Sequence, residues 1–204
     1  MSYLELKEEN LIAKGGERDC YAHPKDNTKV VKTLHTQGIH NNQNELEYMY
    51  MSYLKRKSIN LSHVTDCYGY IDTNFGKGLI FDRVLDYDNK PTKSFRFMVA
   101  NKIILMDIQK ELIEELKNYL ETNLVLFVDT SLTNIFCQEI DENRYKLIIV
   151  DGLGSKRLGL KFWLYRNSKV YTKYKIRRQW EKFMTMYDKD IKRVKLGKRP
   201  FTRL

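Results

Sequence analysis

Cysteine is rare in this chain, and its spacing excludes two common kinds of site. The three cysteines, Cys20, Cys67 and Cys137, are odd in number and far apart, and none belongs to a C-x-x-C pair. Disulfide frameworks and structural zinc sites depend on even numbers or close pairs of cysteines. We therefore expect three reduced thiols that are buried in the folded chain.

Histidine is also scarce, and its placement does not fit a zinc hydrolase. The chain has four histidines, His23, His35, His40 and His63, and no two stand four residues apart on a helix beside an acidic residue. Such a helix places two imidazoles and a general base around zinc. We expect no metal site built from protein side chains alone.

Long apolar stretches are absent as well. No segment approaches the roughly 18 apolar residues of a membrane span, and residues 1–9 contain no apolar core of a signal peptide. The 204 residues are 42% apolar and 12% aromatic, which is sufficient for one compact domain or two small lobes. We expect a cytoplasmic protein without a transmembrane segment.

Acidic residues are scarce in only one part of the chain. Residues 156–204 contain 17 Lys or Arg but three acidic residues, a balance of +14, whereas residues 1–155 sum to −4. Such a basic segment either serves solubility or binds an anionic partner, such as a phosphorylated substrate, a membrane surface or nucleic acid. The charge alone leaves these alternatives open.

The first ninety residues have the pattern of short strands around one helix. β-Branched and aromatic runs predict the strands, and breakers such as Gly15-Gly16 separate them. Residues 44–55 have apolar side chains at four-residue spacing, which predicts an amphipathic helix. The expected order is three strands, a helix and two strands, at residues 11–13, 20–22, 29–34, 44–55, 64–71 and 77–84.

The second half is expected to be mainly helical. An apolar stripe with four-residue spacing predicts a long helix over residues 99–121. Short strands are expected at 124–128, 135–137 and 145–150, one or two helices over 162–187, and a mobile basic tail at 189–204. The predicted class is α+β, with an N-terminal antiparallel sheet lobe and one helix in residues 1–84 and a small, mainly helical lobe in residues 85–188.

Polar residues beyond the long helix have the spacing that phosphoryl transfer uses. Asp129 and Asn134 are five residues apart, like the catalytic aspartate and magnesium-binding asparagine of protein kinases. Asp151 follows an apolar run and precedes Gly152, as in a metal-binding Asp-Phe-Gly turn. Mg²⁺ prefers such oxygen ligands together with phosphate oxygens. We predict Asn134 and Asp151 as metal ligands and Asp129 as the catalytic base.

The first half supplies the matching phosphate-binding residues. Lys32 stands on the third strand and Glu45 early on the next helix, like the kinase lysine that contacts phosphates and the glutamate that pairs with it. Gly15 and Gly16 lack the G-x-G-x-x-G spacing but would let backbone N–H groups approach phosphates, where Arg18 would add a cation or lie on the surface. The order of these elements predicts a reduced protein-kinase-like fold that binds ATP and Mg²⁺.

These residues also resemble the YrbL family, which is named for the PhoP regulatory network of Gram-negative bacteria and is grouped with kinase-like folds. The resemblance runs from about residue 11 to residue 183. It includes the segments Gly15 to Pro24, Val31-Lys32, Glu45 to Tyr48, Tyr68-Gly69, Gly76 to Asp82, Asp86 to Pro91, Asn134 to Cys137 and Asp151 to Gly154. It implies a kinase-like fold, and we include Phe81 and Asp82 among the cofactor-binding residues.

The chain departs from full protein kinases at two positions and in the length of its C-terminal part. Phe127 stands where kinases have a histidine, and Gly152 stands where they have the phenylalanine of the metal-binding turn. Only about 50 residues follow Asp151, too few for a full peptide-binding lobe. The leading expectation is therefore a phosphotransferase for a small or anionic acceptor, such as a lipopolysaccharide-type sugar phosphate or another envelope precursor.

Two other functions stay open. A pseudokinase would bind nucleotide, or nothing, and act as a regulatory interaction module. A nucleic-acid-binding protein would use the basic segment and its aromatic residues to stack on bases, but we expect those aromatics to form the apolar faces of helices instead. They are Trp163, Tyr171, Tyr174 and Trp180. The oligomeric state is left open.

Overall fold

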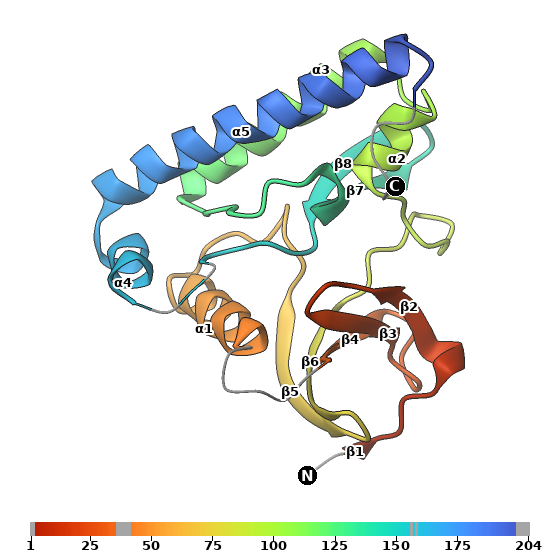
Figure 1. Cartoon of the computed structure of the whole chain (residues 1–204), viewed down its shortest axis with the longest axis vertical. Coiled ribbons are helices and arrows are strands. Elements are labelled where there is room, and N and C mark those ends of the chain that lie inside the picture. The colour runs from red at the N-terminus through yellow and green to blue at the C-terminus, as the bar shows by residue number, and fades with distance from the viewer. Residues whose placement is uncertain (1–2, 36–41, 156, 158, 199–204) are drawn as a thin grey trace. The chain divides into compact units, whose positions relative to one another are not determined.

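The computed structural model describes residues 3–35, 42–155, 157 and 159–198, and it divides into two compact units. The N-terminal unit contains the residues up to Ile59 together with Thr65–Arg83 and, from the later part of the chain, Arg157. The C-terminal unit contains Asn60–Val64, Val84–Ser155 and the residues from Gly159 onward. A six-stranded sheet, a two-stranded sheet and several helices confirm the α+β class (Figure 1). His40 lies outside the described residues.

The N-terminal unit is built on the six-stranded sheet, whose strand order is β1-β5-β6-β4-β3-β2. The first strand pairs with β5 in parallel, and the other neighbours are antiparallel. The strands are β1 (Tyr3–Leu4), β2 (Leu11–Lys14), β3 (Arg18–Ala22), β4 (Lys29–Leu34), β5 (Cys67–Thr73) and β6 (Gly76–Asp82). The five strands expected from the sequence are confirmed within a few residues, whereas β1 and the short 3-10 helix η1 (Glu8–Asn10) carry too few residues to be predicted.

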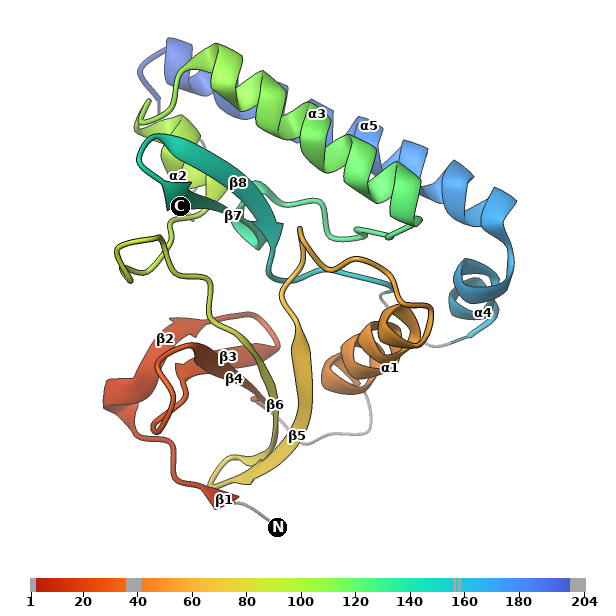
Figure 2. The ribbon, with the colours of Figure 1, turned by 180° about the vertical axis from the view of Figure 1, so that it is seen from behind.

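Strand β4 presents alternate side chains to the two faces of this sheet. Val31 is fully buried in an apolar cluster on one face, together with Leu4, Leu6, Tyr21 and Ile71. Lys32, one residue later, points to the opposite face, as the two-residue repeat of a strand requires. That opposite face is covered by helix α1 (Gln43–Arg56), which contacts β4, β5 and β6 (Figures 1 and 2).

The long helix expected over residues 99–121 is in fact two helices. Helix α2 (Phe95–Ala100) ends at a turn in which Lys102 has a left-handed φ of 54° and Ile103 N–H donates to the Met98 carbonyl. Helix α3 (Met106–Asn123) begins only after Leu105, which is extended. The apolar stripe continues across this break because Ile104 is buried without being helical. The spacing of apolar residues alone therefore does not reveal that the helix is interrupted.

The strand expected at residues 124–128 is also wrong. Leu124 ends α3 in a left-handed conformation, and the buried segment after it forms a single bridge, between Phe127 and Leu153. The two later strands are confirmed as the hairpin β7 (Ile135–Asp141) and β8 (Arg144–Ile149), preceded by the 3-10 helix η2 (Leu132–Asn134). The segment 124–128 is apolar because it is buried, not because it pairs in a sheet.

Two helices complete the C-terminal unit: α4 (Leu160–Asn167) and α5 (Lys169–Lys195). Helix α5 lies alongside α3 in both views (Figures 1 and 2), and the Tyr187 hydroxyl donates to Gln109 on that helix. Because α5 continues to Lys195, the tail expected from residue 189 is wrong for residues 189–195, while 199–204 lie outside the described residues. The 27 residues of α5 are too polar to cross a membrane, and no other helix in the described ranges fits a membrane span.

A buried histidine in the C-terminal unit gives its stability a testable pH dependence. His63 donates from Nδ1 to the Leu147 carbonyl at 2.8 Å, its Nε2 lies 3.3 Å from Glu115, and its ring packs on Tyr119. Burial, together with nearby Lys146, lowers the pKa of His63 below its ordinary value, although the Leu147 carbonyl and Glu115 oppose the shift. Folding therefore opposes protonation of this side chain.

We expect the free energy of unfolding to fall as the pH drops below about 6.5, because the unfolded chain then binds a proton that the folded chain resists. Denaturant unfolding at pH 7.5, 6.5 and 5.5 measures the slope. His63→Asn keeps a donor near the Leu147 carbonyl and is expected to reduce the dependence of the unfolding free energy on pH. His23→Asn in the N-terminal unit should keep the wild-type slope. A slope unchanged in His63→Asn would count against this role.

Candidate functional site

Lys32 is a buried cation in the centre of the N-terminal unit. Its Nζ lies 3.4 Å from Oε1 of Glu47 on α1 and 4.3 Å from the centroid of the Phe81 ring on β6. All three side chains are buried. A buried ammonium is strongly unfavourable without a carboxylate partner, so the ion pair is what allows a lysine in this strand.

Arg18 is the second cation on the same carboxylate. Its guanidinium pairs with Oε2 of Glu47 and donates to Oδ1 of Asn44 at 3.1 Å. The Asn44 amide in turn donates to the Lys32 backbone carbonyl at 3.1 Å. These four residues, called the Arg18 cluster below, connect β3, β4 and the first two turns of α1 through buried polar contacts.

One sequence expectation is corrected here, and one of the two alternatives for Arg18 is excluded. Glu47, not Glu45, is the carboxylate beside Lys32, because Glu45 lies on the exposed side of α1. Arg18 is buried against Glu47 instead of lying on the surface. A helical signal for Glu47 existed, because it stands three residues after Asn44 and four before Met51, and all three are buried on one side of α1.

The glycine turn between β2 and β3 is tight at one position only. Gly15 N–H donates to the Arg18 carbonyl at 2.8 Å, and a Cβ atom at Gly15 would lie 2.5 Å from that oxygen. A Cβ atom at Gly16 would meet nothing within 4 Å. Gly15 is therefore required by the turn, whereas a phosphate-binding role for either glycine stays a prediction.

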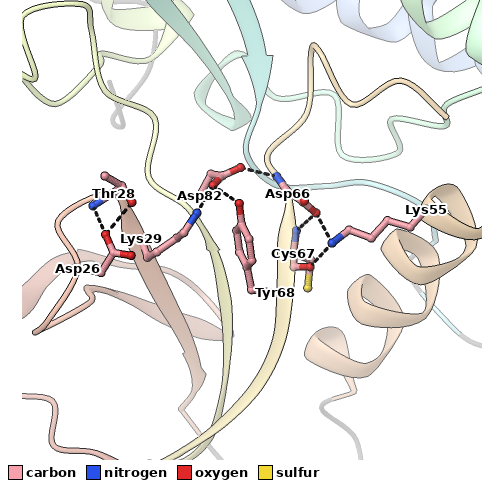
Figure 3. Close-up of polar contacts among 8 residues, drawn as sticks. All are labelled: Asp26, Thr28, Lys29, Lys55, Asp66, Cys67, Tyr68 and Asp82. Atoms are coloured by element: carbon pink, nitrogen blue, oxygen red, sulfur yellow. Dashed lines mark hydrogen bonds and ion pairs between the residues drawn. The ribbon is translucent and has the colours of Figure 1, made fainter. Parts of the chain in front are cut away.

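Asp82, at the end of β6, accepts three hydrogen bonds within the N-terminal unit. Figure 3 shows Lys29 and Tyr68 directed at its Oδ1, at 2.6 and 2.9 Å, and the Asp66 backbone N–H at its Oδ2. Burial alone would lower the pKa of Lys29, but Asp82 and Tyr68 raise it above its ordinary value. Asp82 thus fixes the end of β6, and contact with a cofactor stays a prediction.

Two of the three cysteines are buried thiols with little capacity for chemistry. Cys67 and Cys137 are buried, as expected, whereas Cys20 is only partly buried. Burial raises the pKa of the Cys67 thiol to about 11 and that of Cys137 to about 12. Both therefore stay protonated at neutral pH, and a thiolate nucleophile is not expected at either position.

In the C-terminal unit, Asp129 and Asn134 are in direct contact. The Asn134 amide donates to Oδ2 of Asp129 at 2.9 Å and to its backbone carbonyl at 3.1 Å. Ser131 holds the intervening turn, since its carbonyl accepts from Asn134 N–H. Asp129 is exposed and Asn134 partly exposed, so their oxygens are open to a ligand.

Backbone hydrogen bonds bring Asp151 to the same loop. Val150 N–H donates to the Asn134 carbonyl at 2.9 Å, and Val128 N–H donates to the Gly152 carbonyl at 2.7 Å. Gly152 has a left-handed φ of 83°, and a Cβ atom there would lie 2.8 Å from the Asp129 Cβ. A glycine replaces phenylalanine after Asp151 because the two loops approach too closely for a side chain.

Comparison with known proteins identifies the family of this chain. The family described as "PhoP regulatory network protein YrbL" matches residues 4–188. The chain belongs to the YrbL family. YrbL of Escherichia coli (strain K12) and YrbL of Shigella flexneri are each 27% identical to it over 185 residues, which cover 89% of this chain and 86% of each relative.

The YrbL match spans almost the whole of both units. It includes Lys32 and Glu47 in the N-terminal unit and Asp129, Asn134 and Asp151 in the C-terminal unit. The resemblance noted in the sequence is thus confirmed at the level of family. The family description concerns regulation, so the chemistry of the site has to be argued from the residues themselves.

Proposed function

We propose that this YrbL family member binds Mg-ATP and is a kinase-like phosphotransferase. Lys32, held by Glu47, would contact nucleotide phosphates, and Asn134 and Asp151 would supply oxygen ligands to Mg²⁺. Asp129 would accept the proton of the acceptor hydroxyl. Phosphoryl transfer requires mainly these functions: a fixed cation, a bound metal ion and an oriented nucleophile.

The observation that carries the proposal is the buried Lys32–Glu47 ion pair. The lysine lies on a central strand and the glutamate on the helix packed over it, and the two charged groups are 3.4 Å apart. Protein kinases use this pairing to place a phosphate-binding lysine. Apolar residues would fill these positions more favourably if stability were the only requirement. The pair therefore favours a charged ligand.

The contact between Asp129 and Asn134 supports the second part of the proposal. The Asn134 amide orients the Asp129 carboxylate, and this leaves the Asn134 side-chain oxygen for a metal ion. Asp151 would add a carboxylate from the adjacent loop, where its Oδ1 accepts from Gly152 N–H at 2.6 Å. One amide oxygen and one carboxylate are the kind of incomplete set that Mg²⁺ completes with phosphate oxygens and water.

Mg-ATP is expected to raise the thermal stability of the full chain. A ligand at 100 times its dissociation constant adds about 2.7 kcal/mol to the free energy of unfolding. Scanning calorimetry with Mg-ATP, with ATP plus a chelator, and with neither measures this shift. Asp151→Ala should abolish it, whereas Asp141→Ala, an exposed carboxylate on the hairpin of the same unit, should keep it. The nucleotide site is refuted if wild type does not shift, or if Asp151→Ala shifts equally.

A second candidate is a pseudokinase that binds nucleotide without turnover. Phe127 favours it, because this buried phenylalanine stands where active kinases place a histidine. The exposed Asp129, held by Asn134, favours turnover. Both candidates predict the same stabilisation by Mg-ATP, so the decision between them rests on turnover.

A further inference from the structure

Helices α4 and α5 expose large apolar side chains close together in the sequence. Leu160 is 73% exposed, Trp163 58%, Val170 81% and Tyr174 54%. The expectation that the aromatics of this segment form buried helix faces is therefore wrong for Trp163 and Tyr174. Tyr174 points away because it lies opposite the buried row of α5 that includes Thr172 and Ile176.

The same segment carries charge of one sign. Residues 160–180 contain seven Lys or Arg and no acidic residue. Burial and the neighbouring cations Lys182, Arg178 and Lys161 together lower the pKa of Lys175, which indicates how crowded the positive charge is. Like charges at this density repel one another unless an anionic partner compensates them.

One face of α5 combines exposed apolar side chains with positive charge. Val170, Lys173, Tyr174 and Arg177 are spaced i, i+3, i+4 and i+7, so they share a single face of the helix. Beside them lies a groove of about 310 Å³ lined by Lys173, Arg177 and Ile176 of α5 and by Glu121 and Thr122 of α3. Two cations, one carboxylate and one hydroxyl therefore lie next to exposed apolar side chains.

We propose that exposed Leu160 and Trp163 of α4, which contacts α5, form one surface with Val170, Lys173, Tyr174 and Arg177, and that this surface docks the protein on an anionic phospholipid bilayer. Apolar side chains would enter the acyl boundary while Lys173 and Arg177 contact headgroup phosphates. Single-stranded nucleic acid fits less well, because the two most exposed apolar residues of this surface, Leu160 and Val170, are aliphatic and cannot stack on bases. The proposal does not depend on nucleotide binding.

Vesicle co-sedimentation of the full chain without nucleotide tests this surface. We expect binding to vesicles of equal parts phosphatidylglycerol and phosphatidylcholine, weakening with salt, and much less binding to phosphatidylcholine alone. Lys173→Gln with Arg177→Gln should weaken partitioning about 30-fold, since each basic residue near an anionic surface contributes on the order of 1 kcal/mol. Leu160→Ser with Val170→Ser should weaken it about tenfold or more, because both side chains lose contact with hydrocarbon.

Matched controls separate this surface from general positive charge. Lys77→Gln with Lys110→Gln removes two exposed cations elsewhere, and Leu105→Ser with Leu196→Ser removes two equally exposed leucines; both should bind like wild type. Tryptophan emission should shift to shorter wavelength on anionic vesicles, and Trp163→Phe should remove most of that shift. Any of three results would overturn the proposal. They are equal binding to both kinds of vesicle, equal losses of binding in the control variants, and binding to single-stranded RNA without binding to vesicles.

Discussion

Glu47→Gln is expected to lower the free energy of unfolding by about 3–5 kcal/mol, the usual cost of breaking a buried ion pair by removing one partner. The substitution keeps the size of the side chain but removes the negative charge that compensates both Arg18 and Lys32. Two buried cations then remain beside a neutral amide. Denaturant unfolding followed by far-ultraviolet circular dichroism measures the loss, because both tryptophans lie outside the N-terminal unit.

Glu45→Gln is the matched control for this prediction. It removes the same charge two residues earlier on the same helix, but from the exposed side, and it should leave unfolding close to wild type. Arg18→Met, alone and combined with Glu47→Gln, completes a double-mutant cycle, in which the second change should cost less once the first is made. Equal effects of Glu45→Gln and Glu47→Gln would contradict the role of the Arg18 cluster.

The N-terminal unit was predictable because its local patterns and its tertiary structure agree. Strand β4 alternates between an apolar cluster and the face under α1, and α1 shows a helical apolar stripe. Breaks in a pattern were harder to find. The separation of α2 from α3 depends on a left-handed Lys102, and lysine carries no signal for that conformation.

The candidate site was predictable to the level of loops but not of every side chain. Asp129, Asn134 and Asp151 are brought together as their motif spacing suggests. The choice between Glu45 and Glu47 depended on which side of α1 faces the sheet. The helical spacing of Glu47 favoured that side, but the order of the kinase motif pointed to Glu45. The fit of Gly152 against Asp129 is likewise a matter of packing between loops distant in sequence.

Burial of Arg18 changes how the N-terminal part of the site is understood. In a site held by a lysine–glutamate pair alone, rotation of the helix would separate the two charges. Here the glutamate is also bonded to Arg18 on β3, and Asn44 bonds both to Arg18 and to the backbone of β4. The first two turns of α1 are therefore fixed to the sheet at several points, so Lys32 and Glu47 are positioned before any ligand binds.

Asp129→Asn is expected to reduce ATP turnover about 100-fold or more, because it removes a general base while leaving the local geometry in place. The new side chain retains an oxygen that can accept from the Asn134 amide, as Oδ2 of Asp129 does at 2.9 Å. Mg-ATP should therefore still stabilise the variant, which separates loss of catalysis from loss of binding. ADP release by the full chain, measured with Mg-ATP, reports transfer of the γ-phosphoryl group to water as phosphate, so it needs no known acceptor.

Asp141→Asn provides the control, since it makes the same chemical change at an exposed carboxylate on the hairpin of the same unit, and it should retain wild-type turnover. If wild type is stabilised by Mg-ATP but releases no ADP above the level of Asp129→Asn, the buried Phe127 marks a pseudokinase and Asn134 and Asp151 serve nucleotide binding alone. If Asp129→Asn turns over ATP like wild type, Asp129 is not the base. Only turnover that depends on Asp129 and stabilisation that depends on Asp151 would together establish a phosphotransferase.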